Sequence, residues 1–192
     1  MHIISTSVFS VLAVIATTAI SGANAAGCSF VNDATTNLIK SYDKFSASPT
    51  TKPSGQSVIG YGHLCKKKGC TDVPYKFPLT EVNAEVILMQ DMQEATTCLD
   101  SNIASNAKLN ANQWGALASW ALTVGCSSVE KSTLVARLSN GDDPNKVAKE
   151  ELPTYSKDDG NEVLALKRRR NAEVMLFQTP ASEAAFPNCP YD

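Results

Sequence analysis

The sequence is poor in several features that mark particular classes of protein. Aromatic residues make up only 7% of the chain, histidine occurs twice, and the 17 basic residues nearly balance the 19 acidic ones. The resulting net charge of −2 gives no electrostatic basis for capture of a nucleic acid or another polyanion. No Asn-x-Ser/Thr sequon occurs either, so we expect no N-linked glycan.

Long hydrophobic runs are also scarce. The longest, residues 8–20, is too short to span a bilayer and is followed by the small residues of 21–25. This pattern is typical of a secretory signal peptide cleaved after Ala25, although no Lys or Arg precedes the run. We therefore predict a signal peptide over 1–25 and a secreted, extracellular mature protein, residues 26–192, that forms one domain and has no membrane contact. A membrane anchor is the alternative interpretation of the run.

All six cysteines follow the predicted cleavage site, and an even number in a secreted chain implies three disulfides. The two closest cysteines form one predicted pair, the two nearest the chain ends another, and the remaining two the third. The predicted pairs are Cys65–Cys70, Cys98–Cys126 and Cys28–Cys189, one of fifteen possible sets. A zinc site at His63, Cys65 and Cys70 is disfavoured because their spacing fits no common zinc pattern. We expect no metal and no cofactor.

Helical periodicity dominates the rest of the chain. A first helix, capped by Asn32 or Asp33, places Asp43 near its C-terminal end, and Pro49 prevents its continuation. Capping residues and apolar spacing predict further helices over 80–103, 110–125, 132–138, from 144 onward, and over 163–177.

The only convincing β signal lies between residues 46 and 63, where turn residues alternate with short apolar pieces. It predicts a hairpin or a three-stranded sheet. The expected fold is therefore α+β and mostly α-helical. A small β-rich lobe, about 44–78, would be joined by a long helix to a larger helical lobe, about 79–180, which includes the first helix. A cleft between the lobes is the natural place for a ligand.

Several short motifs point to one family. They are NLIK at 37–40, GYGHLC at 60–65, NQWGAL at 112–117, VGC at 124–126, STL at 132–134 and RRRNAE at 168–173. With these motifs in this order, the chain resembles the phage-type lysozymes, glycoside hydrolase family 24, and among them the secreted fungal forms. The resemblance implies a lysozyme-like fold. It also implies cleavage of the β-1,4 bond between N-acetylmuramic acid and N-acetylglucosamine in peptidoglycan.

The catalytic positions of that family are substituted in this chain. The family motif is a Glu near the end of the first helix, an Asp nine residues later and a Thr six residues after that; the same spacing here gives Asp43, Lys52 and Val58. Glycoside hydrolysis needs an acid for the leaving oxygen and a second carboxylate. Asp43 reaches about 1.5 Å less far than a Glu, and Lys52 is a cation where the second carboxylate should be. Val58 lacks the hydroxyl that helps to hold a water.

The final predicted helix carries an arginine triplet. The resemblance implies that its middle residue, Arg169, pairs with the acid of the first helix, so we expect Arg169 to face Asp43. Lys52 can join them in an ion-pair cluster around Asp43. For Arg168 and Arg170 we expect exposure on a basic end of the helix.

His63 is the only histidine after residue 25 and attracts a catalytic interpretation. We expect a structural role instead, in which His63 connects the hairpin to the helical lobe, because a lone His lacks the nucleophile and orienting partner of a triad. Trp114 and Trp120 lie within an apolar stretch and are expected in the core rather than as sugar-stacking platforms. The lysines of 66–68 are expected in a solvated loop.

The sequence therefore predicts a secreted lysozyme-like protein whose hydrolysis is impaired or lost and whose cleft binds peptidoglycan or another GlcNAc-containing glycan. One alternative is an active lysozyme that uses Asp43 as its general acid, in cell-wall catabolism or antibacterial defence. A second alternative is a protein-interaction role without sugar binding. In each case we expect a monomer without a nucleic-acid partner.

Overall fold

The computed structural model describes residues 31–52, 54–158 and 160–185. Its α-helices are α1 (Asp33–Tyr42), α2 (Glu81–Asn102), α3 (Ala111–Val124), α4 (Cys126–Glu130), α5 (Thr133–Ser139), α6 (Pro144–Glu151) and α7 (Leu164–Gln178). Two short 3₁₀ helices are η1 (Lys68–Cys70) and η2 (Leu152–Tyr155). The strands are β1 (Ser46–Thr51), β2 (Ser57–Gly60), β3 (His63–Leu64), β4 (Lys157–Asp158) and β5 (Asn161–Glu162). The fold is mostly helical with small antiparallel sheets, which confirms the predicted α+β class.

Most helix ends coincide with the capping residues seen in the sequence. The side chain of Asn32 accepts a hydrogen bond from the N–H of Thr35 at the start of α1, and Thr80 does the same for α2. At α3, Asn110 and Gln113 form the predicted capping box, in which each side chain accepts from the other's backbone N–H. These contacts are local in sequence, so the helix starts could be predicted without knowledge of the fold.

The three-stranded sheet has the order β1-β2-β3, with both pairs antiparallel. Ile59 of β2 lies opposite His63 of β3, and Ser46 of β1 lies opposite Gly60. Gly60 has a φ of +63°, and a Cβ there would lie 3.3 Å from the Cβ of Ala84 on α2. The sheet therefore approaches α2 closely at a position where glycine is favoured.

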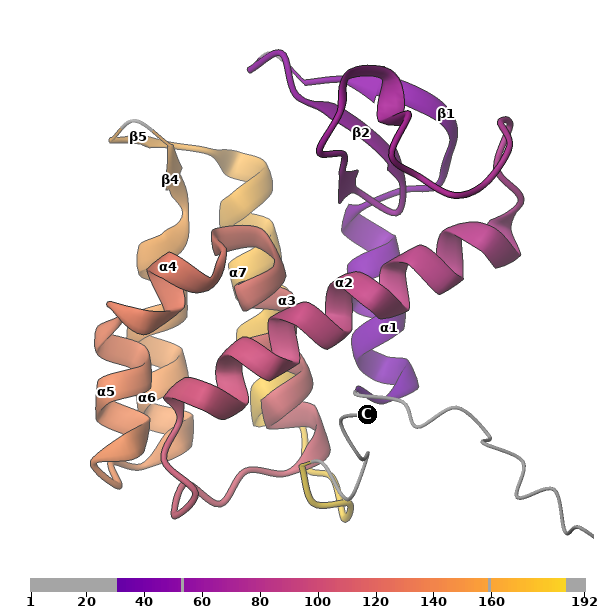
Figure 1. Ribbon diagram of the computed structural model, residues 1–192. Coiled ribbons are helices and arrows are strands. Elements are labelled where there is room, and N and C mark those ends of the chain that lie inside the picture. Colours follow the sequence, from indigo (N-terminus) through magenta and orange to yellow (C-terminus); the bar gives the residue numbers. More distant parts are fainter. Residues whose placement is uncertain (1–30, 53, 159, 186–192) are drawn as a thin grey trace, which may run out of the picture.

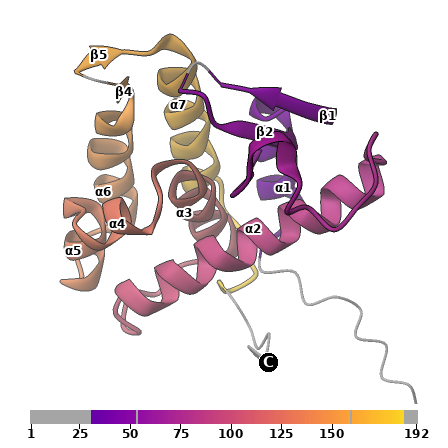
Figure 2. The same ribbon diagram turned by 45° about the horizontal axis from the view of Figure 1, so that its top comes forward.

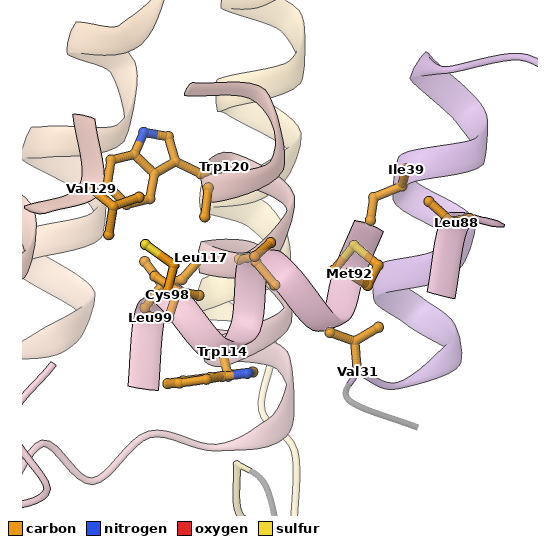
Figure 3. Packing of buried hydrophobic residues seen from close by; sticks show 14 of the residues in the cluster. Val31, Ile39, Leu88, Met92, Cys98, Leu99, Trp114, Leu117, Trp120 and Val129 are labelled. Atoms are coloured by element: carbon orange, nitrogen blue, oxygen red, sulfur yellow. The ribbon is translucent and has the colours of Figure 1, made fainter. Parts of the chain in front are cut away.

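Helix α2 joins the sheet to the other helices. It contains 22 residues, a length of about 33 Å, and runs from beside the sheet to the group formed by α3, α4 and α5 (Figures 1 and 2). Figure 3 shows its buried face: Leu88 and Met92 lie on the side of α1, while Leu99 lies near Leu117 and Trp120. One hydrophobic core thus extends along α2 from α1 into the helical part of the molecule.

Helix α3 lies at the centre of that helical part (Figure 2). Both of its tryptophans are buried, with exposed fractions of 5% for Trp114 and 0% for Trp120, as predicted. Gly115 allows the close approach of α1, since a Cβ at this residue would lie 1.7 Å from the Oγ1 of Thr35. The small residue of the NQWGAL motif is thus required by packing between α1 and α3.

Helix α4 and the β4–β5 hairpin were not predicted from the sequence. Helix α4 is only five residues long and follows directly after Gly125, which ends α3. Strands β4 and β5 pair antiparallel, Lys157 with Glu162 and Asp158 with Asn161, so the 46–63 segment is not the only β structure. Their four side chains are polar and exposed, so the alternation of apolar and polar residues that marks a half-buried strand is missing.

Two of the three predicted disulfides lie in the described residues. Cys65 is bonded to Cys70 and Cys98 to Cys126, as predicted. The third predicted pair, Cys28–Cys189, and the predicted signal peptide lie outside the described residues. Among the described helices, none combines the length and the apolar character needed to cross a membrane.

Candidate functional site

A cleft of about 630 Å³ is lined by residues from both the sheet side and the helical side of the molecule. Its walls come from the end of α1, the hairpin, the middle of α2, the C-terminal end of α3 and the face of α7. Its charged residues are Asp43, Lys52, His63, Lys66, Asp72, Asp91, Glu94 and Arg169. The structure thus brings together four of the five predicted site residues.

Val58 is the exception. It lies within β2 opposite Thr50 and Leu64, is half-buried, and is not among the residues that line the cleft. The position that carries the water-holding Thr in the family motif is therefore occupied by an apolar side chain inside the sheet.

Asp43 is held in place from three directions. It caps the C-terminus of α1, where its N–H donates to the carbonyl of Ile39 at 2.8 Å. Nη1 of Arg169 lies 2.5 Å from Oδ2 of Asp43, which confirms the predicted contact. Gly62, at a φ of +85°, packs against the carboxyl group, since a Cβ there would lie 3.0 Å from Cγ of Asp43. The pairing of the acid of the first helix with an arginine of the final helix, which the resemblance implies, is thus present in this structure.

Arg169 belongs to a buried polar network between α7 and α3. Its Nε donates to Glu173 at 3.3 Å and its Nη2 to the Oγ of Ser119 at 3.2 Å. Ser119 in turn donates to Oε1 of Glu173 at 2.7 Å. Burial raises the pKa of Glu173, while the charges of Arg170 and Arg169 oppose that rise. The network fixes the guanidinium that holds Asp43.

The expectation that Arg170 is exposed is wrong, whereas Arg168 is exposed as predicted. Arg170 is 1% exposed, and its Nη2 donates to Glu173 at 2.8 Å and to Oγ1 of Thr123 at 2.9 Å. Burial lowers the pKa of Arg170. Glu173 was missed as a partner; its spacing of three and four residues from the two arginines is the signal that could have indicated it.

Lys52 lines the cleft but does not join the ion pair. Its N–H donates to the carbonyl of Gln56 at 2.9 Å, and its own carbonyl accepts from Gly55 at 2.8 Å, so the backbone is fixed in the hairpin turn. The side chain makes no ion pair with any residue that the structure describes. The predicted cluster of Lys52 with Arg169 around Asp43 is therefore wrong, since among the described residues Asp43 forms its ion pair with Arg169 and not with Lys52.

His63 connects β3 to α2, as predicted for a structural residue. Its Nδ1 lies 2.9 Å from Oδ1 of Asp91 in the middle of α2. The hydrogen bond to Asp91 is the largest cause of a raised His63 pKa; burial opposes it, and the charges of Asp72 and Glu94 add to it. Asp91 was not found from the sequence, since a lone acid in a long helix carries no sign of its distant partner.

The other carboxylates of the cleft differ in whether they already have a hydrogen-bond or ion-pair partner. Asp72 accepts hydrogen bonds from the backbone N–H groups of Lys66 at 2.9 Å and Lys67 at 3.1 Å, and the bond from Lys66 is the main cause of its lowered pKa. Asp91 is engaged by His63. Glu94 is exposed and makes no side-chain hydrogen bond or ion pair within the described part of the chain. The same part of the chain contains no cluster of metal-ligating side chains.

Comparisons with known proteins all indicate similarity to phage lysozymes and endolysins. The family model for phage lysozyme matches residues 40–173. The endolysin of Bacillus phage PZA is 31% identical over 154 residues, which are 78% of this chain and 55% of that protein, so the chain spans about half the length of this relative.

Solved structures show the same fold. The muramidase domain of SpmX from Asticaccaulis excentricus aligns with a TM-score of 0.65 at 24% identity, over 78% of this chain and 98% of that one. A mutant form of P22 lysozyme aligns with a TM-score of 0.64 at 23% identity, also over 78% and 98%. At these identities the likeness concerns the fold.

Proposed function

This chain belongs to the phage lysozyme family, and from that premise we propose that it is a secreted lysozyme-like protein that binds a glycan in its cleft and has lost, or nearly lost, hydrolysis. The ligand we propose is peptidoglycan or another GlcNAc-containing glycan. We further propose that residues 26–192 act as a single monomeric domain after removal of a signal peptide.

The proposal rests on the residues that occupy positions 43 and 52, the two positions at which the family motif has its carboxylates. Asp43 is shorter by one methylene than the family's Glu, and Lys52 brings an ammonium group to the cleft where the family has a carboxylate. An ammonium cannot take a proton from water and opposes the positive charge that develops on the sugar in the transition state. Binding needs neither group in its catalytic form, so a cleft with these substitutions supports recognition better than hydrolysis.

A second candidate function, slow hydrolysis, is favoured by one specific observation. Glu94 is a carboxylate without a partner in the described residues, and it lines the same cleft as Asp43. Asp43 keeps 30% of its side chain exposed and would serve as the acid, with Glu94 as the base that activates water.

The proposal is tested by peptidoglycan cleavage. We expect no cleavage by the native protein and a gain of cleavage in the triple variant Asp43→Glu, Lys52→Asp, Val58→Thr, which restores the acid, the second carboxylate and the hydroxyl. Lys76 is an exposed lysine outside the cleft, so Lys76→Asp is the matched control for the charge change. This variant should show no peptidoglycan cleavage.

Other results would decide against the proposal. Native cleavage as fast as that of an ordinary phage lysozyme would contradict the loss of hydrolysis. Slow native cleavage that disappears in Glu94→Gln would instead support the second candidate. If the native protein bound no peptidoglycan fragment in a calorimetric titration, the glycan-binding role would be wrong, and a role in protein contacts would take its place.

A further inference from the structure

Most charged groups of the cleft already have a partner within the protein. The engaged groups are the Asp43–Arg169 pair, the His63–Asp91 pair and Asp72, which accepts from two backbone N–H groups. Within the described residues, three charged side chains of the cleft make no hydrogen bond or ion pair; these are Lys52, Lys66 and Glu94. They are the groups whose charge remains available to a ligand.

Lys52 differs from an ordinary surface lysine in two respects. Its backbone is fixed by hydrogen bonds to Gln56 and Gly55 across the hairpin turn, so the point from which the side chain extends is defined. The side chain makes no hydrogen bond or ion pair with any described residue, although Asp43 lines the same cleft. Because Arg169 takes the Asp43 carboxylate, the charge of Lys52 is left without a counter-ion in the described part of the cleft.

Glu94, the acid of the cleft without a partner in the described residues, does not neutralise the charge of Lys52. The charge of Glu94 acts on His63, together with those of Asp91 and Asp72, and no ion pair joins Glu94 to Lys52. Asp91, Asp72 and Glu94 thus act on His63, while the cation of Lys52 extends from the hairpin turn. A ligand that carries an anionic group beside the hairpin would find an ammonium with three free donors.

We propose that Lys52 is a specificity-determining residue that makes the cleft prefer glycans bearing carboxylate groups over a neutral glycan of the same N-acetylated backbone. This inference rests on the proposed function, binding of a glycan in the cleft. The carboxylate belongs either to a lactyl group on the sugar or to a peptide attached to it. In both cases the recognising contact is a charge-assisted hydrogen bond from the ammonium to a carboxylate oxygen.

The test compares three probes by calorimetric titration at low ionic strength. They are neutral chitotetraose, a GlcNAc–MurNAc tetrasaccharide with free lactyl carboxylates, and the same tetrasaccharide with its stem peptides. We expect the native protein to bind at least one carboxylate-bearing probe about 2- to 5-fold more tightly than chitotetraose, as for an exposed ion pair. The probe that shows the gain identifies the source of the carboxylate, and added salt should remove the gain.

Variants assign the preference to Lys52. Lys52→Gln should make the affinities for the carboxylate-bearing probes and for chitotetraose equal, and Lys52→Asp should reverse the preference. Lys76→Gln, an exposed lysine outside the cleft, should behave as the native protein. Since Lys52 is exposed and its side chain bonds to no described residue, these variants are expected to fold.

The inference and the proposed function fail in different ways. Equal binding of all three probes, or a preference that survives in Lys52→Gln, would overturn the role of Lys52 and leave glycan binding intact. Tighter binding of a cationic, deacetylated chitooligosaccharide would also overturn it and would point to Glu94 instead. Binding of none of the probes would overturn both the inference and the proposed function.

Discussion

Asp43 is the side chain that the structure positions most firmly in the cleft. Its carboxyl group lies between Gly62 and Arg169, and its backbone caps α1. The surrounding positions thus remain as a site for a carboxylate. The carboxylate is shorter than that of a Glu and is bound to a guanidinium that Glu173 and Ser119 hold from behind. At this scale the chemistry of the cleft depends on which charged neighbour each side chain contacts. The contact of His63 with Asp91 gives the clearest test.

We predict that the His63–Asp91 pair stabilises the protein in a pH-dependent way. Because the His63 pKa in the folded protein is raised above its ordinary value of 6.5, its contribution is fully present below that value and is lost as the pH rises through the folded-state pKa. Denaturation of the native protein, His63→Gln, Asp91→Asn and the double variant gives the coupling energy. The coupling should be larger at about pH 5 than at about pH 9, because fewer His63 side chains are protonated at the higher pH. A coupling that does not change between these values would contradict the prediction.

The contact between α1 and α3 illustrates the scale of elements. Asn32, which caps α1, donates from Nδ2 to Oδ1 of Asn112 on α3 at 2.7 Å, and Asn112 donates to the carbonyl of Thr179 at 3.0 Å. Beside this polar connection, Gly115 faces Thr35 without space for a Cβ. The two helices therefore meet through a glycine and amide side chains, and this contact helps to position the end of α1, where Asp43 lies.

Gly115→Ala should destabilise the protein by about 1–3 kcal/mol, because the new Cβ would lie 1.7 Å from Oγ1 of Thr35. Urea denaturation would measure the loss. In a double-mutant cycle with Thr35→Ala, which removes Oγ1, the combined loss should be smaller than the sum of the two single losses. Strict additivity would show that the two residues do not crowd one another.

At the scale of the whole molecule, α2 connects the sheet to the helical part (Figure 1). Residues from the middle of α2 line the cleft. The Cys98–Cys126 disulfide bonds α2 to the start of α4 and closes a sequence separation of 28 residues. Both sulfur-bearing residues line the cleft. The cross-link therefore holds the helical wall of the cleft against α2, and its removal should weaken the fold as a whole.

The double variant Cys98→Ala, Cys126→Ala is expected to lose about 2–4 kcal/mol of unfolding free energy, because the unfolded chain regains the entropy of the closed loop. Guanidinium denaturation of the oxidised protein would give the value. Ser127→Ala, an exposed neighbour of Cys126, is the control and should change stability by less than about 0.5 kcal/mol. An unchanged midpoint in the double variant would show that the cross-link adds nothing to stability.

The predictions that succeeded and those that failed differ in the range of the interactions on which they depend. The starts of α1, α2 and α3 follow from side chains that cap a backbone three residues away, so the sequence alone indicates them. The β4–β5 hairpin was missed because two-residue polar strands leave no periodic pattern. Asp91 and Glu173 were missed because their importance depends on partners brought close by the fold.

The sequence by itself determined which chemical groups occupy the positions predicted from the family motif, since the spacing of Asp43, Lys52 and Val58 is a property of the chain. Only the tertiary structure decided how those groups are used. Asp43 and Arg169 are 126 positions apart, and their ion pair exists because α7 packs beside the end of α1. Coulomb attraction depends on distance in space and not along the chain, so it is the fold that pairs Asp43 with Arg169 and leaves Lys52 without an ion pair among the described residues.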